Sequence, residues 1–188
     1  MNTTATTPAT TTWKIDPAHS LVEFAARHMM ITTVKGRMAD VQGTLVIDEQ
    51  DPTRSEARVE IAAASIDTRS ADRDTHLRSP DFLDVDEHPT LLFVARDVRG
   101  ASARPGSTFQ VAGELTIRGV TREVTLDATY EGKGQDPWGG ERVSFSATTK
   151  IDRRDFGLTW NAALEAGGVL VSNDIRITLE VQAVRADG

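Results

Sequence analysis

Residues 109–130 read FQVAGELTIRGVTREVTLDATY, and this stretch points most directly to the fold class. In both halves apolar or small side chains alternate with mostly polar ones, which is the period of a β-strand with one buried face. The dipeptide Arg118-Gly119 separates the halves, and so short a connection favours antiparallel neighbours, because parallel strands need a crossover of about a dozen residues or more. We therefore predict two adjacent antiparallel strands.

The same alternation recurs along most of the chain. The strand candidates fall at residues 22–28, 43–47, 59–63, 91–95, 109–117, 124–130, 143–151 and 175–181. Most connections are short and rich in turn formers, so the chain should run up and down. Eight antiparallel strands with one apolar face each form either a sandwich or a closed barrel.

Two longer segments interrupt the strand pattern. Residues 67–89 contain a charged stretch that predicts a short helix over Ala71 to Arg78, followed by Pro80. This stretch is either a solvated helix face or a source of arginines at the mouth of a barrel. Residues 153–168 predict a turn or a short helix that ends at Gly167-Gly168.

The predicted apolar faces carry many small residues. Ala and Gly recur on them, and aromatic residues make up only 5% of the chain. An eight-stranded barrel is either filled by its side chains or just wide enough for one slender ligand. Small residues favour the second outcome, because an apolar void stays dry and accepts an apolar guest. The alternative is that small residues sit opposite large ones in a packed core.

Composition excludes several classes of protein. The 188 residues fit one domain, the net charge is −7, and cysteine is absent. A negative surface repels phosphate backbones, so nucleic acid is not an expected partner. The lack of cysteine rules out disulfides, thiolate nucleophiles and Cys-ligated metals. The four histidines also lack the spacing of a metal site, although Asp or Glu could complete one that the sequence does not reveal. We predict neither a metal nor a cofactor.

The first twelve residues differ from the rest of the chain. Residues 2–12 read NTTATTPATTT, with neither the basic nor the apolar part of a signal peptide. We expect residues 1–12 to form a disordered Thr-rich tail and residues 13–188 to form the domain. No later segment approaches the roughly 18 consecutive apolar residues of a membrane span, and we expect a cytoplasmic protein.

Residues suited to catalysis occur near the start of the domain. Asp16, His19 and Ser20 are the residue types of acyl-transfer chemistry, but a triad is an arrangement in space and not a sequence motif. A tight turn at Asp16-Pro17, with local backbone hydrogen bonds, is the favoured interpretation. His28 continues the apolar face of Val22, Phe24 and Ala26, so it is either a structural residue or a polar contact for a ligand.

A series of motifs runs in order along the chain: WKIDPAHS at 13–20, SIDT at 65–68, RDTHLRSPDFLD at 73–84, GELTIRGVT at 113–121, GKGQDPWGG at 132–140 and RRDFG at 153–157. With these motifs the chain, from Trp13 to Val184, resembles the YceI-like family of lipid- and polyisoprenoid-binding proteins. The last of these motifs accounts for a kinase-like Asp-Phe-Gly that no other kinase motif accompanies.

The resemblance implies an extended, lipocalin-like antiparallel barrel of eight strands with a short helical segment. It also implies an elongated cavity for a long isoprenoid, such as a polyprenyl quinone. Members are often dimers, and neither metal nor catalytic residues come with the family. Many members are exported to the periplasm, whereas this chain shows only the Thr-rich start.

Alternation and resemblance together predict an all-β barrel that binds, sequesters or transports a long amphiphilic lipid without converting it. The lipid would be a polyisoprenoid, an isoprenoid quinone or a fatty-acid-like molecule. The expected ligand-binding residues are Val22, Phe24, Ala26, His28, Val59, Ile61, Phe93, Leu115, Val124, Phe145 and Ile177. The alternative is a small lipid hydrolase or isomerase that uses His19, Ser20 and Asp16, or His28.

Overall fold

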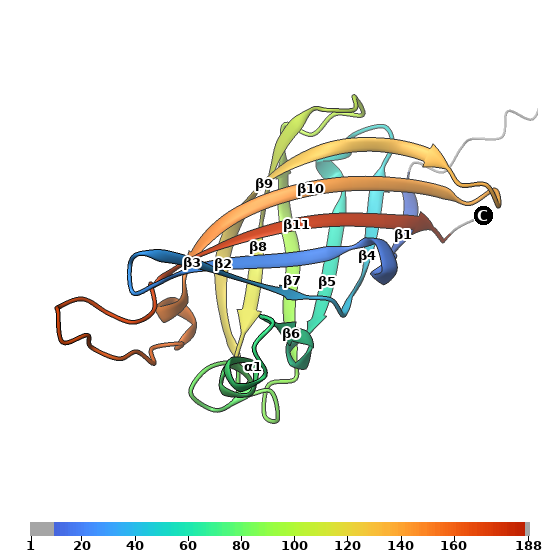
Figure 1. The fold of residues 1–188 in the computed structure, drawn as a ribbon. Helices are drawn as coiled ribbons and strands as arrows, with labels where there is room; N and C mark the ends of the chain where they lie inside the picture. The colour runs from blue at the N-terminus through green and yellow to red at the C-terminus, as the bar shows by residue number, and fades with distance from the viewer. Residues whose placement is uncertain (1–9, 187–188) are drawn as a thin grey trace, which may run out of the picture.

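The computed structural model describes residues 10–186 as one antiparallel sheet that closes into a barrel (Figure 1). Its strands are β1 (Thr10–Ile15), β2 (Leu21–His28), β3 (Thr32–Met38), β4 (Val41–Asp48), β5 (Glu56–Ala62), β6 (Ile66–Asp67), β7 (Thr90–Arg99), β8 (Thr108–Ile117), β9 (Val120–Gln135), β10 (Glu141–Asp152) and β11 (Asp174–Arg185). The ring runs β1-β4-β5-β7-β8-β9-β10-β11, and β11 pairs with β1 to close it.

Two of the eight barrel strands are interrupted, and each of them consists of two consecutive strands, β1 with β2 and β3 with β4. The C-terminal part of β11 pairs with β1, and its N-terminal part pairs with β2. A 3₁₀ helix, η1 (Pro17–His19), interrupts the chain between them. In the same way β3 pairs with β2 and β4 pairs with β1. The β1–β2 and β3–β4 units therefore each act as one strand, and the predicted barrel of eight antiparallel strands is confirmed.

The first strand begins earlier than the sequence predicted. Thr10, Thr11 and Thr12 pair with Asp48, Ile47 and Val46 of β4, so the predicted tail is three residues too long. Thr11 is buried, and its hydroxyl accepts a hydrogen bond from Trp13 Nε1 at 2.8 Å. β-Branched threonine suits an extended strand, which the polar composition of this stretch concealed. The rest of the predicted tail, residues 1–9, lies outside the described residues.

The predicted helix is confirmed as α1 (Ala71–Arg78), which lies against one end of the barrel (Figure 1). Its charged residues hold it to the segment before it. The buried carboxylate of Asp74 accepts hydrogen bonds from the backbone N and the hydroxyl of Thr68, at 2.8 and 2.6 Å. Arg78 donates to the carbonyl oxygens of Ala64 and Ile66. These charges are therefore structural, in addition to covering an exposed surface.

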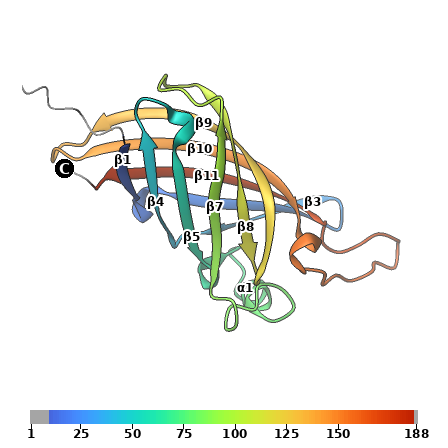
Figure 2. The ribbon, with the colours of Figure 1, turned by 180° about the vertical axis from the view of Figure 1, so that it is seen from behind.

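The region that the sequence left as a turn or short helix contains η4 (Arg153–Phe156), followed by an extended loop over residues 157–173. Gly157 ends η4 with φ 75°, a left-handed conformation that favours glycine. Figure 2 shows this loop beside the β2–β3 hairpin at one end of the molecule. Phe156 is 1% exposed, so the Asp-Phe-Gly motif serves packing and backbone geometry.

Candidate functional site

A cavity of about 380 Å³ occupies the interior of the barrel. Its wall is formed almost entirely by apolar side chains that the alternating pattern turns inward. Ten of the eleven predicted residues line it: Val22, Phe24, Ala26, Val59, Ile61, Phe93, Leu115, Val124, Phe145 and Ile177. The interior is therefore not filled by its own side chains. That these residues bind a ligand stays a prediction.

His28 is the predicted residue that lies away from the cavity wall. It ends β2 and forms an isolated bridge with Val171 in the loop that follows η4. Its carbonyl oxygen accepts the N–H of Ile31 in the turn of the hairpin. The alternation of Val22, Phe24 and Ala26 continues to His28 in sequence, but the strand has passed the end of the cavity by then.

Two glycines help to keep the cavity open. A Cβ atom on Gly36 would lie 2.3 Å from Cζ of Phe24, and one on Gly113 would lie 2.6 Å from Cζ of Phe93. Each phenyl ring therefore lies over a glycine of a neighbouring strand, in space that the side chain of any other residue at that glycine position would fill. This arrangement places the rings along the wall and leaves the centre free.

One end of the cavity is closed by α1 and the loop after η4. Leu77, Phe82 and Leu83 form part of this end, together with Leu158 and Val171. All five side chains are apolar. The end next to α1 is therefore suited to the terminus of a hydrocarbon chain.

Arg153 fixes the loop that crosses this closed end. Its side chain is 3% exposed, and burial lowers the pKa of the guanidinium below its ordinary value. Nε donates to the carbonyl oxygen of Ser172 at 2.9 Å, and Nη1 donates to those of Leu158 and Trp160 at 2.7 and 2.8 Å. One side chain thus holds both ends of the loop.

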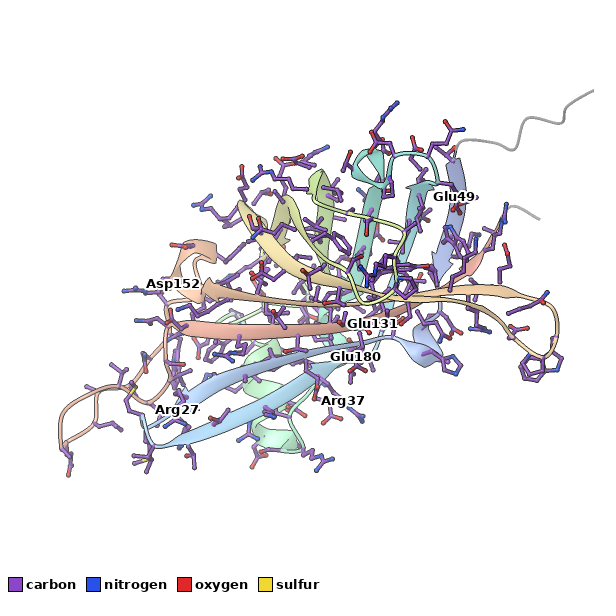
Figure 3. All side chains as sticks on the ribbon, turned by 90° about the horizontal axis from the view of Figure 1, so that it is seen from above. Arg27, Arg37, Glu49, Glu131, Asp152 and Glu180 are labelled. Atoms are coloured by element: carbon purple, nitrogen blue, oxygen red, sulfur yellow. The ribbon has the colours of Figure 1, made fainter. Side chains whose placement is uncertain are left out.

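Polar groups gather at the other end of the cavity, which we call the polar end: Asp48, Glu49, Glu56, Tyr130 and Lys133. Lys133 Nζ lies 3.5 Å from Oε1 of Glu49 and 5.3 Å from the ring centroid of Trp13. Burial, and secondarily the charge of Glu49, raises the pKa of Tyr130. Figure 3 shows Glu49 at the opposite end of the barrel from Arg27. The polar end was not predictable from the sequence, because its residues come from separate turns and strand ends.

The candidate catalytic residues do not form a nucleophile–base pair. The Ser20 hydroxyl donates to the carbonyl oxygen of Gln182 at 3.2 Å and accepts the N–H of the same residue at 3.1 Å. His19 is exposed, and its Nδ1 lies 2.8 Å from Oδ2 of Asp16, which also caps η1. Neither these three residues nor His28 lines the cavity. The interpretation as a capped turn with local backbone hydrogen bonds is confirmed.

Asp16 belongs instead to a network that joins three parts of the barrel. Arg142 of β10 donates to Oδ2 of Asp16 at 2.7 Å, to Oδ2 of Asp136 at 2.9 Å and to Oε1 of Gln182 at 2.9 Å. The hydrogen bond from Arg142, followed by that from His19, lowers the pKa of Asp16 from 3.8 to about 2. The network therefore stabilises the corner where η1 meets β10 and β11.

Asp16→Asn is expected to lower the free energy of unfolding at pH 7 by about 1 kcal/mol, since Asp16 is only 17% exposed and charge-assisted bonds are lost. Because the pKa is lowered in the fold, the contribution is complete above pH 3.8 and fades as the pH falls through about 2. Urea unfolding at pH 7 and near pH 2 should therefore show the two proteins converging at the lower pH.

Asp51→Asn is the matched control for this prediction. Asp51 caps the 3₁₀ helix η2 (Pro52–Arg54) in the same way, but its side chain bonds only Thr53 and Arg54 nearby. Its replacement should cost less than that of Asp16. An equal loss in both variants, or a loss in Asp16→Asn that persists unchanged near pH 2, would show that the Arg142 network adds nothing to stability.

Comparisons with known proteins agree with this architecture. A family model described as "YceI-like domain" matches residues 13–183. A UPF0312 protein of Serratia proteamaculans is 38% identical over 176 residues, covering 93% of this chain and 86% of the relative. The crystal structure of a Campylobacter jejuni YceI protein is 28% identical, with a TM-score of 0.72 over 86% of this chain and 90% of that one.

A more distant structure shares the fold alone. It is described as a polyisoprenoid binding domain from Saccharophagus degradans, and it is 12% identical, with a TM-score of 0.68 over 92% of this chain and 98% of that one. Within residues 10–186, α1 and the 3₁₀ helices are all too short to cross a bilayer.

Proposed function

Because the chain belongs to the YceI-like family, we propose that it binds a long amphiphilic lipid inside the barrel and carries or sequesters it without chemical change. The favoured ligand class is a polyisoprenoid or an isoprenoid quinone, and a fatty-acid-like chain is the nearest alternative. The description of the Saccharophagus degradans domain as polyisoprenoid binding supports this class. The engagement of the Ser20 hydroxyl by the backbone of Gln182 favours binding over catalysis.

The observation that carries the proposal is the apolar cavity with its charges gathered mainly at one end. Four of the five charged residues along the wall belong to the polar end, and the fifth, Arg153, is occupied by backbone carbonyl groups. Hydrocarbon burial contributes about 25 cal/mol per Å², so a tail that buries roughly 300 Å² gains about 7–8 kcal/mol before the costs of binding. Apolar contact alone can therefore hold the tail.

The same distribution of polarity orients the ligand. We place the hydrocarbon terminus against Leu77, Phe82 and Leu158, at the end next to α1. The head group then lies near Glu49, Tyr130 and Lys133, where an ammonium, carboxylates and a phenol can offer hydrogen bonds. Since the wall beyond the polar end would contact only hydrocarbon, the length and shape of the tail should matter more for affinity than the chemistry of the head.

Organic extraction of the purified protein, followed by mass spectrometry, tests the proposal. We expect a long-chain lipid in near-stoichiometric amount, and we expect an added prenyl quinone to raise the Tm, because a ligand that binds only the folded state stabilises it. Protein that carries no lipid under several expression conditions, and whose Tm responds to neither prenyl quinones nor fatty acids, would contradict it.

A further inference from the structure

The turn of the β2–β3 hairpin has an unusual sequence for its geometry. Met29 and Met30 have φ values of 52° and 61°, and the N–H of Ile31 bonds the carbonyl oxygen of His28. The hairpin loop contains three residues, and the β-turn over residues 28–31 has both of its central residues in the left-handed region. Such a turn strongly favours Asn-Gly at these two positions, because a larger side chain crowds the backbone there. A local sequence that opposes its own turn geometry is expected chiefly where function requires it.

The side chains of this turn are exposed to solvent, and its backbone bonds a second segment that carries an exposed apolar residue. Met29, Met30 and Ile31 are 42%, 56% and 72% exposed. Val169, on the loop after η4, is 36% exposed, and the N–H of Met29 bonds the carbonyl oxygen of Leu170 at 2.8 Å. We call Met29, Met30, Ile31 and Val169 the apolar tip. Figures 1 and 2 show that the hairpin and the loop project together from one end of the barrel.

A row of cations lies on the outer face next to the apolar tip. Arg176 of β11 and Lys35 of β3 flank Ala25 of β2 in register. Arg27 lies one step nearer the tip, where it donates to the hydroxyl of Thr33 and to the carbonyl oxygen of Met30. We call Arg27, Lys35 and Arg176 the basic strip.

The basic strip keeps its positive charge exposed to solvent. In residues 10–186, none of its three members has a carboxylate within salt-bridge distance. The nearby carboxylates of Asp152 and Asp174 are bound by Arg154 and Lys150. Glu23 and Glu180 on the same outer face, and Asp155 and Glu165 near the loop, are acidic, so the positive surface is confined to the strip itself. A local positive surface is notable on a chain of net charge −7.

We propose that the apolar tip and the basic strip dock the barrel onto an anionic lipid bilayer. The tip would enter the boundary between head groups and acyl chains, while the strip meets the anionic head groups. A second copy of the chain fits this surface less well, because a two-fold contact would place the basic strip of one copy against the identical basic strip of the other, and like charges repel. This inference concerns the outer surface, so it goes beyond the proposed cargo and stands independently of it.

Cosedimentation with vesicles tests the docking. The wild-type protein should bind mixed phosphatidylcholine–phosphatidylglycerol vesicles at least about tenfold more tightly than pure phosphatidylcholine vesicles, since each cation near an anionic surface adds to binding. Added salt should weaken this binding. The absence of binding to either vesicle would overturn the proposal.

Met29→Asn with Met30→Gly separates docking from folding. The pair supplies the residues that the turn prefers, so the Tm should be equal to or above that of the wild type, while vesicle binding falls at least about tenfold. Trp138→Ala is the matched control, because Trp138 is 87% exposed on the β9–β10 turn, outside the apolar tip. It should bind vesicles like the wild type. Wild-type binding by the double variant, or an equal loss in Trp138→Ala, would overturn the proposal.

The basic strip has its own matched pair of variants. Lys35→Gln with Arg176→Gln should weaken binding to the mixed vesicles by about tenfold or more. Arg58→Gln with Arg96→Gln changes the net charge equally, on β5 and β7 outside the strip, and should leave binding intact. If both pairs of substitutions weaken vesicle binding equally, the net charge and not the basic strip governs binding, and the proposal is wrong. If the wild-type protein does not bind vesicles but self-associates through the apolar tip, the tip binds a second copy of the chain and the membrane proposal is wrong.

Discussion

Ala147→Phe is expected to weaken the binding of a long-chain lipid by about 100-fold or more, with the barrel still folded. Ala147 faces the cavity from β10, in register with Ala128 of β9 and Leu179 of β11, and all three line the wall. The added phenyl ring would occupy the space of the tail, so most of the apolar contact that drives binding is lost. Titration with a fluorescent fatty acid or a prenyl quinone measures the effect.

Thr148→Phe is the control for this prediction. Thr148 is the next residue of β10, and it is exposed on the outer face, so the same ring added there should leave affinity unchanged. Circular dichroism and the Tm report whether each variant folds. Should Ala147→Phe fail to fold, Ala95→Met on β7 narrows the same cavity with a flexible side chain. Wild-type affinity in a folded cavity-facing variant would place the ligand elsewhere.

Arg153→Met should lower the free energy of unfolding by about 3–5 kcal/mol. Methionine fills much of the volume but donates no hydrogen bond, so the buried carbonyl groups of Leu158 and Ser172 and the partly buried one of Trp160 lose their partner. Unsatisfied buried acceptors keep their full desolvation cost, which exceeds the gain from removing a buried charge. Urea unfolding at pH 7 measures the loss.

Arg154→Met tests whether the loss at Arg153 comes from burial. Arg154 is the adjacent residue of η4, but its side chain is exposed and bonds only Asp152. An exposed ion pair contributes about 0–1 kcal/mol, so this variant should remain close to the wild type. Similar losses in the two variants would show that the closed end of the cavity does not depend on the Arg153 hydrogen bonds.

The barrel strands and the helix were predictable because their signals are local. Alternation over residues 109–117 or 175–181 needs no knowledge of distant partners, and it also identified the inward side chains, because a strand has only two faces. Alternation does not tell where a strand leaves the barrel, so His28 was assigned to the cavity. Alternation also does not identify β1, whose threonines look like a polar tail, or β3, where Gly36 leaves room for the ring of Phe24.

The polar end and the apolar tip could not be predicted in the same way. Glu49 follows β4 and Lys133 lies in β9, so only the closed barrel brings them within 3.5 Å. Met29 and Val169 are likewise distant in sequence, and the bond from Met29 to Leu170 joins their segments. Such groups depend on tertiary structure, which a pattern along one strand does not contain.

Closure of the ring has a consequence for the synthesis of this protein. The contact between Trp13 and Arg185 joins the first strand to the last, so the sheet has two open edges until β11 has been made. Contacts between residues so far apart in sequence slow folding, and unpaired strand edges invite aggregation. A nascent chain whose other seven barrel strands are complete would still be vulnerable, which makes the pairing of β11 with β10 and β1 the step at which chaperones would matter most.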